Sequence, residues 1–207
     1  DGNHKYKLAA VRSHLKKQEK FAANNKMRYN PGKCKLLLAN RNRDHNIIVP
    51  KLTFCEEELK PSDTVTYLGV QYDRDSTMKP YVQSVYGKCN SRLARLGWMI
   101  KNSDLTPKEA MNAIKPLVFS LTSYGSITWM GMKQHEDKMN TLMTKARRIA
   151  CRAERWQTTK SLDAILPAPD KTVSQWCNDI NLRWYKKNRN KEGAIANSIK
   201  NIASDLI

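Results

Sequence analysis

The spacing of apolar positions changes along the chain, and its first part favours strands. Three short apolar runs, "CKLLLAN", "KLTFC" and "VTYLGVQY", lie between residues 34 and 72 and are separated by stretches rich in Asn, Asp and Pro. Val, Thr, Tyr and Phe within these runs favour extended structure. We therefore predict a small antiparallel sheet of three strands, preceded by a moderately amphipathic helix over residues 5–25.

From Pro80 onward the apolar spacing becomes three and four, which is typical of amphipathic helices. The first apolar stripe consists of Val82, Val85, Cys89, Leu93, Leu96 and Ile100. A second helix should begin after Thr106, because Pro107 suits the first helical position and Glu109 can close a capping box with Thr106. Pro116 should kink or interrupt this helix, and Gly125 should end it or weaken it.

A third helix is predicted over residues 133–155. Its apolar stripe consists of Met139, Leu142, Met143, Ala146, Ile149, Ala150 and Ala153. Three consecutive helices with short connections favour a small bundle. Pro167 and Pro169 then mark a boundary at 157–170, after which the sequence is helix-like again at 171–189 and 193–206.

Together these elements predict an α+β fold that is mostly helical. We expect residues 1–79 to hold the first helix and the small antiparallel sheet, and residues 80–156 to form the three-helix bundle. Residues 157–207 should form a helical C-terminal extension.

Charge points to the class of partner. The chain carries 37 Lys and Arg residues against 19 Asp and Glu, a net charge of +18. Such an excess repels itself unless a polyanion neutralises it, so nucleic acid is the leading candidate partner. The five cysteines are odd in number and widely spaced, which favours free thiols in a reducing intracellular compartment. No apolar stretch reaches the roughly 20 residues that span a bilayer, so we expect no membrane partner.

Two rows of basic residues are the candidate nucleic-acid-binding positions. One row lies on the predicted third helix and consists of Lys138, Lys145, Arg148, Arg152 and Arg155. Their spacing of seven, three, four and three puts them on one face, opposite the apolar stripe. A second row on the first bundle helix consists of Lys88, Arg92 and Arg95. Solvated outer faces would explain one such row, whereas two rows on adjacent helices favour contact with phosphates.

Residues typical of catalysis or metal binding form no convincing cluster. Asp73 and Asp75 could pair around a metal, but a solvated turn explains them better. The four histidines are scattered among polar residues, which favours surface placement. The five tryptophans lie at or near apolar helical faces, so we expect most of them to pack in the core and assign none to base stacking. We expect no metal, no cofactor and no small-molecule substrate.

Four segments in order, "NKMRYNPGKCKLLL", "VTYLGVQYD", "LARLGWM" and "AIKPLVFSLTSYGSITW", resemble the C-terminal part of reverse transcriptases from non-LTR (LINE-type) retrotransposons. The resemblance covers residues from about 8 to about 156. It implies that residues 30–33 turn into the last part of the palm domain, and that Tyr67, Leu68 and Gly69 belong to the primer-grip strand. It also implies that the helical bundle is the thumb domain, which holds the template–primer duplex.

The catalytic carboxylates of that family, an upstream Asp and a Tyr-x-Asp-Asp box, do not occur in this sequence. Two-metal polymerisation needs such clustered carboxylates, so the chain alone should not copy nucleic acid. We therefore predict a non-catalytic remnant that grips RNA or an RNA–DNA duplex through its phosphates. Two alternatives remain open: a basic structural subunit of a ribonucleoprotein such as a ribosome, and a fragment of an active reverse transcriptase.

Overall fold

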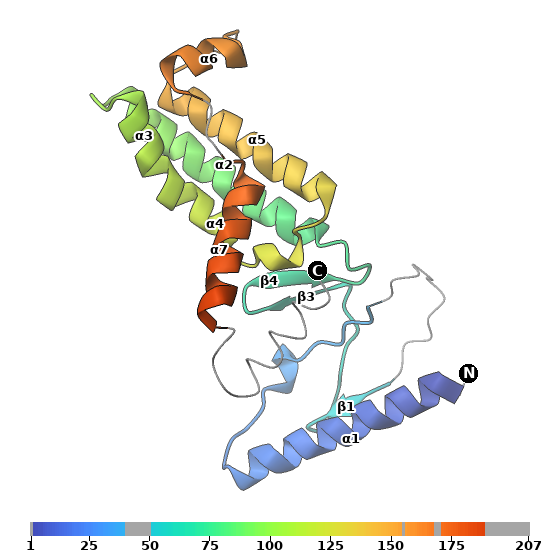
Figure 1. The fold of residues 1–207 in the computed structure, drawn as a ribbon. Coiled ribbons are helices and arrows are strands. Elements are labelled where there is room, and N and C mark those ends of the chain that lie inside the picture. The colour runs from blue at the N-terminus through green and yellow to red at the C-terminus, as the bar shows by residue number, and fades with distance from the viewer. Residues whose placement is uncertain (1, 40–50, 155, 168–170, 189–207) are drawn as a thin grey trace. The chain divides into compact units, whose positions relative to one another are not determined.

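The computed structural model describes residues 2–39, 51–154, 156–167 and 171–188. Its contacts divide the chain into two compact units, Asp1–Pro80 and Tyr81–Ile207, and each unit is described by itself. Helices dominate and the strands are few and short (Figure 1), which confirms the prediction of a mostly helical α+β fold.

The first unit contains one long helix and two β-hairpins. Its elements are α1 (Gly2–Asn24), the 3-10 turn η1 (Pro31–Lys33), β1 (Thr53–Phe54), β2 (Glu57–Glu58), β3 (Thr64–Tyr67) and β4 (Val70–Asp73). β1 pairs with β2 and β3 pairs with β4, both antiparallel. The strands thus form two separate two-stranded sheets, and the expectation of a single three-stranded sheet is wrong in this respect.

Backbone conformation explains where the chain turns back in the two hairpins. Leu68 and Gly69 have φ angles of 47° and 78°, and Cys55 and Glu56 have φ angles of 50° and 67°. Two consecutive residues with positive φ form the two-residue turn that matches the twist of a hairpin. The run "VTYLGVQY" is therefore a hairpin with Leu68 and Gly69 at its tip. The predicted strand over "CKLLLAN" is reduced, within residues 34–39, to an isolated parallel bridge between Leu36 and Pro61.

Helix α1 packs against the first hairpin through a small apolar core. Ala22, Leu52 and Phe54 are buried, and the rings of Phe54 and Tyr29 lie 5.0 Å apart between centroids. The backbone N–H of Cys55 donates to the Glu19 carboxylate at 2.6 Å, which fixes the hairpin turn against the helix.

The second unit is a helical bundle. Its elements are α2 (Lys79–Lys101), α3 (Pro107–Ile114), the π-helical turn η2 (Lys115–Phe119), α4 (Ser120–Ser123), the 3-10 turn η3 (Ser126–Thr128), α5 (Lys133–Ala150), α6 (Thr159–Ile165) and α7 (Val173–Asn188). Five of the six residues in the predicted stripe of α2 are buried, the exception being the half-buried Leu96. This confirms α2 as the first bundle helix.

The second predicted helix begins and breaks as expected. Thr106 accepts from the backbone N–H of Glu109 while the Glu109 carboxylate accepts from the backbone N–H of Thr106, which is the predicted capping box. Helical geometry changes from α to π at the turn that contains Pro116. Gly125 has a φ of 62° and follows the end of α4. Proline lacks the backbone donor of a regular helix, which explains the interruption.

The third helix and the segment directly after it differ from the prediction, whereas the predicted helix over 171–189 is confirmed as α7. α5 ends at Ala150, five residues before the predicted end, and α6 forms within the segment that was expected to be a boundary. α7 packs against α4, α5 and η3, and it lies beside α4 in Figure 1. The predicted helix over 193–206 lies outside the described residues.

Some aromatic and histidine side chains lie elsewhere than expected. Trp129 is fully buried and Trp176 is half-buried against Phe119, but Trp98, Trp156 and Trp184 are exposed. The expectation that most tryptophans pack in the core is therefore wrong, because helical periodicity does not show which neighbouring element covers a face. His135 is buried rather than on the surface.

Candidate nucleic-acid interface

Lys88, Arg92 and Arg95 lie together along one flank of α2. An α-helix advances by about 100° per residue, so side chains at this spacing fall within about 60° of one another. They border a groove of about 440 Å³ on the outer face of the helix. The groove is lined by Gln83, Ser84, Gly87, Lys88, Ser91, Arg92, Arg95 and Leu121. No carboxylate belongs to this lining, so its net charge is positive.

Arg92 is held by the interrupted helix beside it. Its Nη1 donates to the carbonyl oxygen of Leu117 at 2.6 Å, within the π-helical turn that contains Pro116. A guanidinium has five N–H donors, and this contact uses one of them. Arg92 therefore combines a fixed position with donors that can reach a ligand in the groove.

Lys138 and Lys145 of α5 meet on the other flank of α2, at Tyr86. Lys145 Nζ donates to the Tyr86 hydroxyl at 2.8 Å and to Asn90 Oδ1 at 3.0 Å. Lys138 Nζ and Lys145 Nζ lie 5.0 Å and 4.8 Å from the centre of the Tyr86 ring, within the range of cation–π attraction. Thr141 completes the cluster at 3.1 Å from the Tyr86 hydroxyl.

The cluster changes the ionisation of its phenol. Partial burial by itself raises the pKa of Tyr86, but the hydrogen bonds from Lys145, Thr141 and Asn90, with the charge of Lys145, lower it below its ordinary value. The same contacts join α5 to α2, so Lys138 and Lys145 have a structural role as well as a positive field.

Arg148 and Arg152 instead bind backbone carbonyls. Arg148 donates to the carbonyls of Glu154 and Gln157. Arg152 donates to the carbonyls of Ile100, Ser103 and Leu105 at 2.6 to 3.2 Å. These three carbonyls lie at and just beyond the C-terminal end of α2, whose partial negative charge attracts a cation.

The end of α5 explains why the predicted row is not continuous. The N–H of Arg152 donates to the carbonyl of Ile149, and the N–H of Ala153 donates to the carbonyl of Arg148. These two bonds form a Schellman motif, in which the residue after the cap takes a left-handed conformation. Arg152 has a φ of 50°, so its side chain leaves the face of α5. Arg155 lies outside the described residues.

Tyr67, Leu68 and Gly69 belong to the first unit. Tyr67 ends β3 and is 65% exposed, Leu68 is 72% exposed, and Gly69 completes the turn of the hairpin. The hairpin therefore presents two large apolar side chains at its tip.

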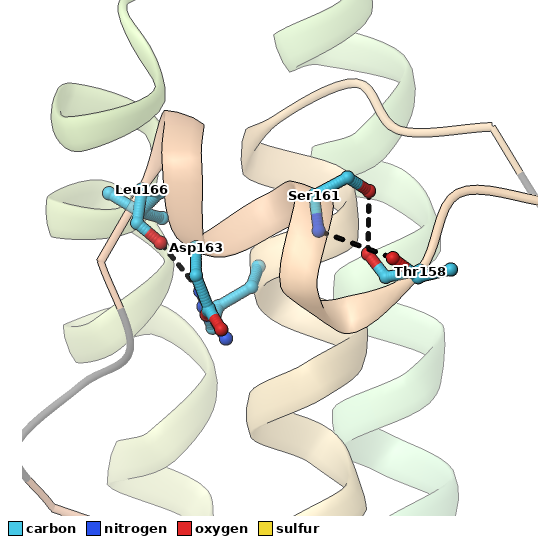
Figure 2. A network of polar contacts seen from close by, with 5 residues as sticks. Thr158, Ser161, Asp163 and Leu166 are labelled. Atoms are coloured by element: carbon cyan, nitrogen blue, oxygen red, sulfur yellow. Dashed lines mark hydrogen bonds and ion pairs between the residues drawn. The ribbon is translucent and has the colours of Figure 1, made fainter.

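Sequence reasoning missed the buried cation Arg147. It is 4% exposed, and its Nη2 contacts Asp163 Oδ1 at 2.6 Å and the carbonyl of Leu166 at 2.5 Å. Figure 2 shows these contacts beside Thr158 and Ser161, which cap the start of α6. Arg147 therefore fastens α6 to α5. Its position next to the basic row hid this role, because periodicity alone does not separate a buried arginine from an exposed one.

Of the two acidic candidates, Asp73 has structural contacts, and its burial shows that the expectation of a solvated turn is wrong at this residue. Asp73 is buried, and its carboxylate accepts from the N–H and hydroxyl of Thr77 and from the N–H of Met78. It thereby fixes the turn that leads into α2. Within the described ranges, no group of three or more His, Cys, Asp or Glu side chains could hold a metal ion.

Comparisons with known proteins give no match. No protein-family model matches the chain, and neither the curated proteins nor the solved structures contain a match. In the part of the chain that the structure describes, no helix is both long enough and apolar enough to span a membrane. Functional inference therefore depends on the geometry of the residues themselves.

Proposed function

We propose that the groove on α2 binds the phosphates of RNA or of an RNA–DNA duplex, and that the chain is a nucleic-acid-binding protein without polymerase activity of its own. The observation that carries the proposal is the convergence of Lys88, Arg92 and Arg95 on a groove with no carboxylate in its lining. This proposal agrees with the resemblance in sequence between the segments "LARLGWM" and "AIKPLVFSLTSYGSITW" and the thumb domain of non-LTR reverse transcriptases.

The dimensions of the groove suit a nucleic-acid backbone. Lys88 and Arg95 are seven residues apart, which corresponds to about 10 Å along a helix axis. Each strand of double-stranded DNA carries one negative charge per about 3.4 Å of axis, so this length spans several phosphates. Ser84 and Ser91 add hydroxyl groups that can donate to phosphate or sugar oxygens. Contacts of this kind position a duplex without reading its sequence.

Lys138 and Lys145 strengthen the positive field from the opposite flank of α2. Lys145 Nζ has three donors, of which the contacts with Tyr86 and Asn90 use two. Only two ion pairs occur among the described residues, Arg147 with Asp163 and Lys171 with Asp179. Neither pair involves the groove or the Tyr86 cluster. The cations on both flanks are therefore not neutralised by carboxylates of the described chain.

Salt-dependent binding tests the proposal. The full chain would be titrated into a labelled RNA hairpin, an RNA–DNA hybrid and a DNA duplex at several salt concentrations. The groove variant carries Lys88→Ala, Arg92→Ala and Arg95→Ala. The control variant carries Lys108→Ala, Lys115→Ala and Lys160→Ala, which remove the same charge from exposed positions outside the groove.

We expect binding to favour the RNA-containing helices and to weaken strongly in the groove variant. The slope of log affinity against log salt should fall by about 0.7 to 0.9 for each phosphate that the variant no longer neutralises, or about 2 to 3 in total. The control variant should keep most of the slope. Equal losses of affinity in the two variants, with circular dichroism showing both folded, would contradict a specific role for the groove.

A second candidate function, a structural subunit of a ribonucleoprotein, is favoured by a separate observation. Tyr124, just before η3, Ile127 within η3 and Trp184 of α7 are 57%, 56% and 56% exposed, and η3 packs against α7. Large apolar side chains left exposed on elements that pack together are typical of a surface covered by a protein neighbour. Stable co-sedimentation with a large RNA-containing particle, unaffected by the groove substitutions, would favour this second function.

A further inference from the structure

Trp98 lies on the outer face of α2, beyond the end of the groove. It follows Ser91 by seven residues, so the two side chains point within about 20° of one another and are about 10 Å apart along the axis. Its side chain and backbone together are 73% exposed. No aromatic ring contact with Trp98 occurs among the described side chains. The indole is thus a large apolar surface left in water at one end of a basic groove.

Two cations flank Trp98 along the helix, while the adjacent Met99 is 58% exposed. Arg95 precedes it by one helical turn and Lys101 follows it by one turn, and neither is buried. Covering this position with an apolar protein surface would remove two charges from water without compensation, which is costly. A nucleic-acid strand offers phosphates to the cations and a flat base to the ring. The chemistry around Trp98 therefore favours a nucleotide over an apolar protein partner.

At the C-terminal end of α2, close to Trp98 in sequence, the carbonyl charge that would repel an anion is offset by a cation. The last carbonyls of an α-helix carry partial negative charge, which would repel a phosphate. The guanidinium of Arg152 donates to the carbonyl of Ile100, in the last turn of α2, and to the carbonyls of Ser103 and Leu105 just beyond it. Because this cation offsets the carbonyl charge, a strand that passes Trp98 meets little repulsion from the helix end.

We propose that Trp98 stacks on an unpaired base next to the duplex held in the groove. The ligand is then a duplex with a single-stranded extension, and the groove holds the paired part while the indole holds the first unpaired nucleotide. This inference rests on the proposed function, since the groove must first bind the duplex. Stacking suits any base, so no sequence preference is expected from Trp98 itself.

The experiment compares three RNA hairpins with the full chain: one with a blunt end, one with a short single-stranded extension, and one with an abasic extension of equal length. The variants are Trp98→Ala and Trp98→Phe. The matched control is Trp156→Ala, which removes an indole that is 79% exposed and does not belong to α2.

We expect the wild-type chain to prefer the base-bearing extension over the abasic one by about 5- to 150-fold, the range for stacking of a base on an aromatic side chain. Trp98→Ala should abolish this preference and leave the blunt hairpin bound as before. Trp98→Phe should retain part of the preference, and Trp156→Ala should retain all of it.

Three outcomes would overturn the inference: no preference in the wild-type chain, an unchanged preference in Trp98→Ala, or an equal weakening of all three hairpins in Trp98→Ala. The proposed function fails by a different result, namely blunt-hairpin binding that ignores substitution of Lys88, Arg92 and Arg95. Failure of the stacking proposal can therefore be distinguished from failure of the groove proposal.

Discussion

Replacing Arg152 tests whether this residue stabilises the fold or binds nucleic acid. The sequence predicted nucleic-acid binding at this position. Its guanidinium makes four hydrogen bonds to the carbonyls of Ile100, Ser103 and Leu105. A hydrogen bond from a charged donor contributes about 1.5 to 3 kcal/mol when it is buried. The bonds to Ile100 are partly buried and the others are exposed, so their contribution is smaller. We expect Arg152→Ala to lower the free energy of unfolding by about 2 to 3 kcal/mol.

The backbone at this position makes the prediction sharper. Arg152 has a φ of 50°, a conformation that costs a residue with a Cβ about 1 kcal/mol or more relative to glycine. Arg152→Gly loses the same hydrogen bonds but removes this strain. It should therefore be more stable than Arg152→Ala by about 1 kcal/mol, an order opposite to that expected within a helix. Arg152→Lys should lie between wild type and Arg152→Ala, because one ammonium cannot reach all the carbonyls.

Urea unfolding of the full chain, followed by far-ultraviolet circular dichroism, measures these differences. The chain has two compact units, so each transition is fitted separately and assigned to its unit by the variants that shift it. Two results would refute the reasoning: an Arg152→Ala variant within about 0.5 kcal/mol of wild type, or a glycine variant less stable than the alanine variant. Binding of a blunt RNA hairpin provides a second check, because its salt slope should change little in Arg152→Ala.

Two further predictions concern groups with shifted pKa values. Tyr86 should titrate below its ordinary pKa in an ultraviolet difference spectrum, and its pKa should rise in Lys145→Ala, which loses a hydrogen bond and a charge that lower it. Because the pKa of Tyr86 is lowered in the folded state, the stabilising effect is complete above about pH 10, the ordinary pKa of tyrosine, and is lost as pH falls through the folded-state value. A Tyr86 that titrates normally would contradict the cluster described above. Burial raises the pKa of Cys89 and of Cys177 to about 11, so neither thiol should react with maleimide at pH 8 in the folded chain, and both should react after unfolding. If peptide mass spectrometry finds either cysteine labelled in the native chain, that thiol is accessible to solvent and is not buried as described.

Elements with strong local signals were predictable from the sequence. The stripe from Val82 to Ile100 specifies α2, and the capping box of Thr106 and Glu109 specifies the start of α3. Pro116 specifies the break that follows. These features depend on residues within a few positions of one another, so the sequence contains their whole cause.

The hairpins were harder to predict because their turns lack the usual residues. Two-residue hairpin turns favour Asn-Gly or Asp-Gly, whereas the turns here are Leu68-Gly69 and Cys55-Glu56. Leucine, cysteine and glutamate rarely adopt positive φ. The conformational free energy of these turns is offset by pairing of the flanking strands. A run that reads as one strand therefore folds into two.

The candidate site, too, has some residues that local spacing placed correctly and others that it did not. Spacing along α2 was enough to place Lys88, Arg92 and Arg95 on one flank, because all three belong to a single regular helix. Spacing did not show that the side chain of Arg152 leaves the helix face where α5 ends. It also could not show that Arg147 is buried against α6.

By itself, the sequence determined the net charge, the period of each long helix and the local signals that start or interrupt it. Only the tertiary structure decided which cations remain available to a ligand and which bind carbonyls or carboxylates of the chain. The same holds for the indoles: Trp129 is enclosed by the bundle and Trp98 is left outside it. The physical reason is that the partner of a side chain is chosen by elements distant in sequence, whose contacts no local pattern records.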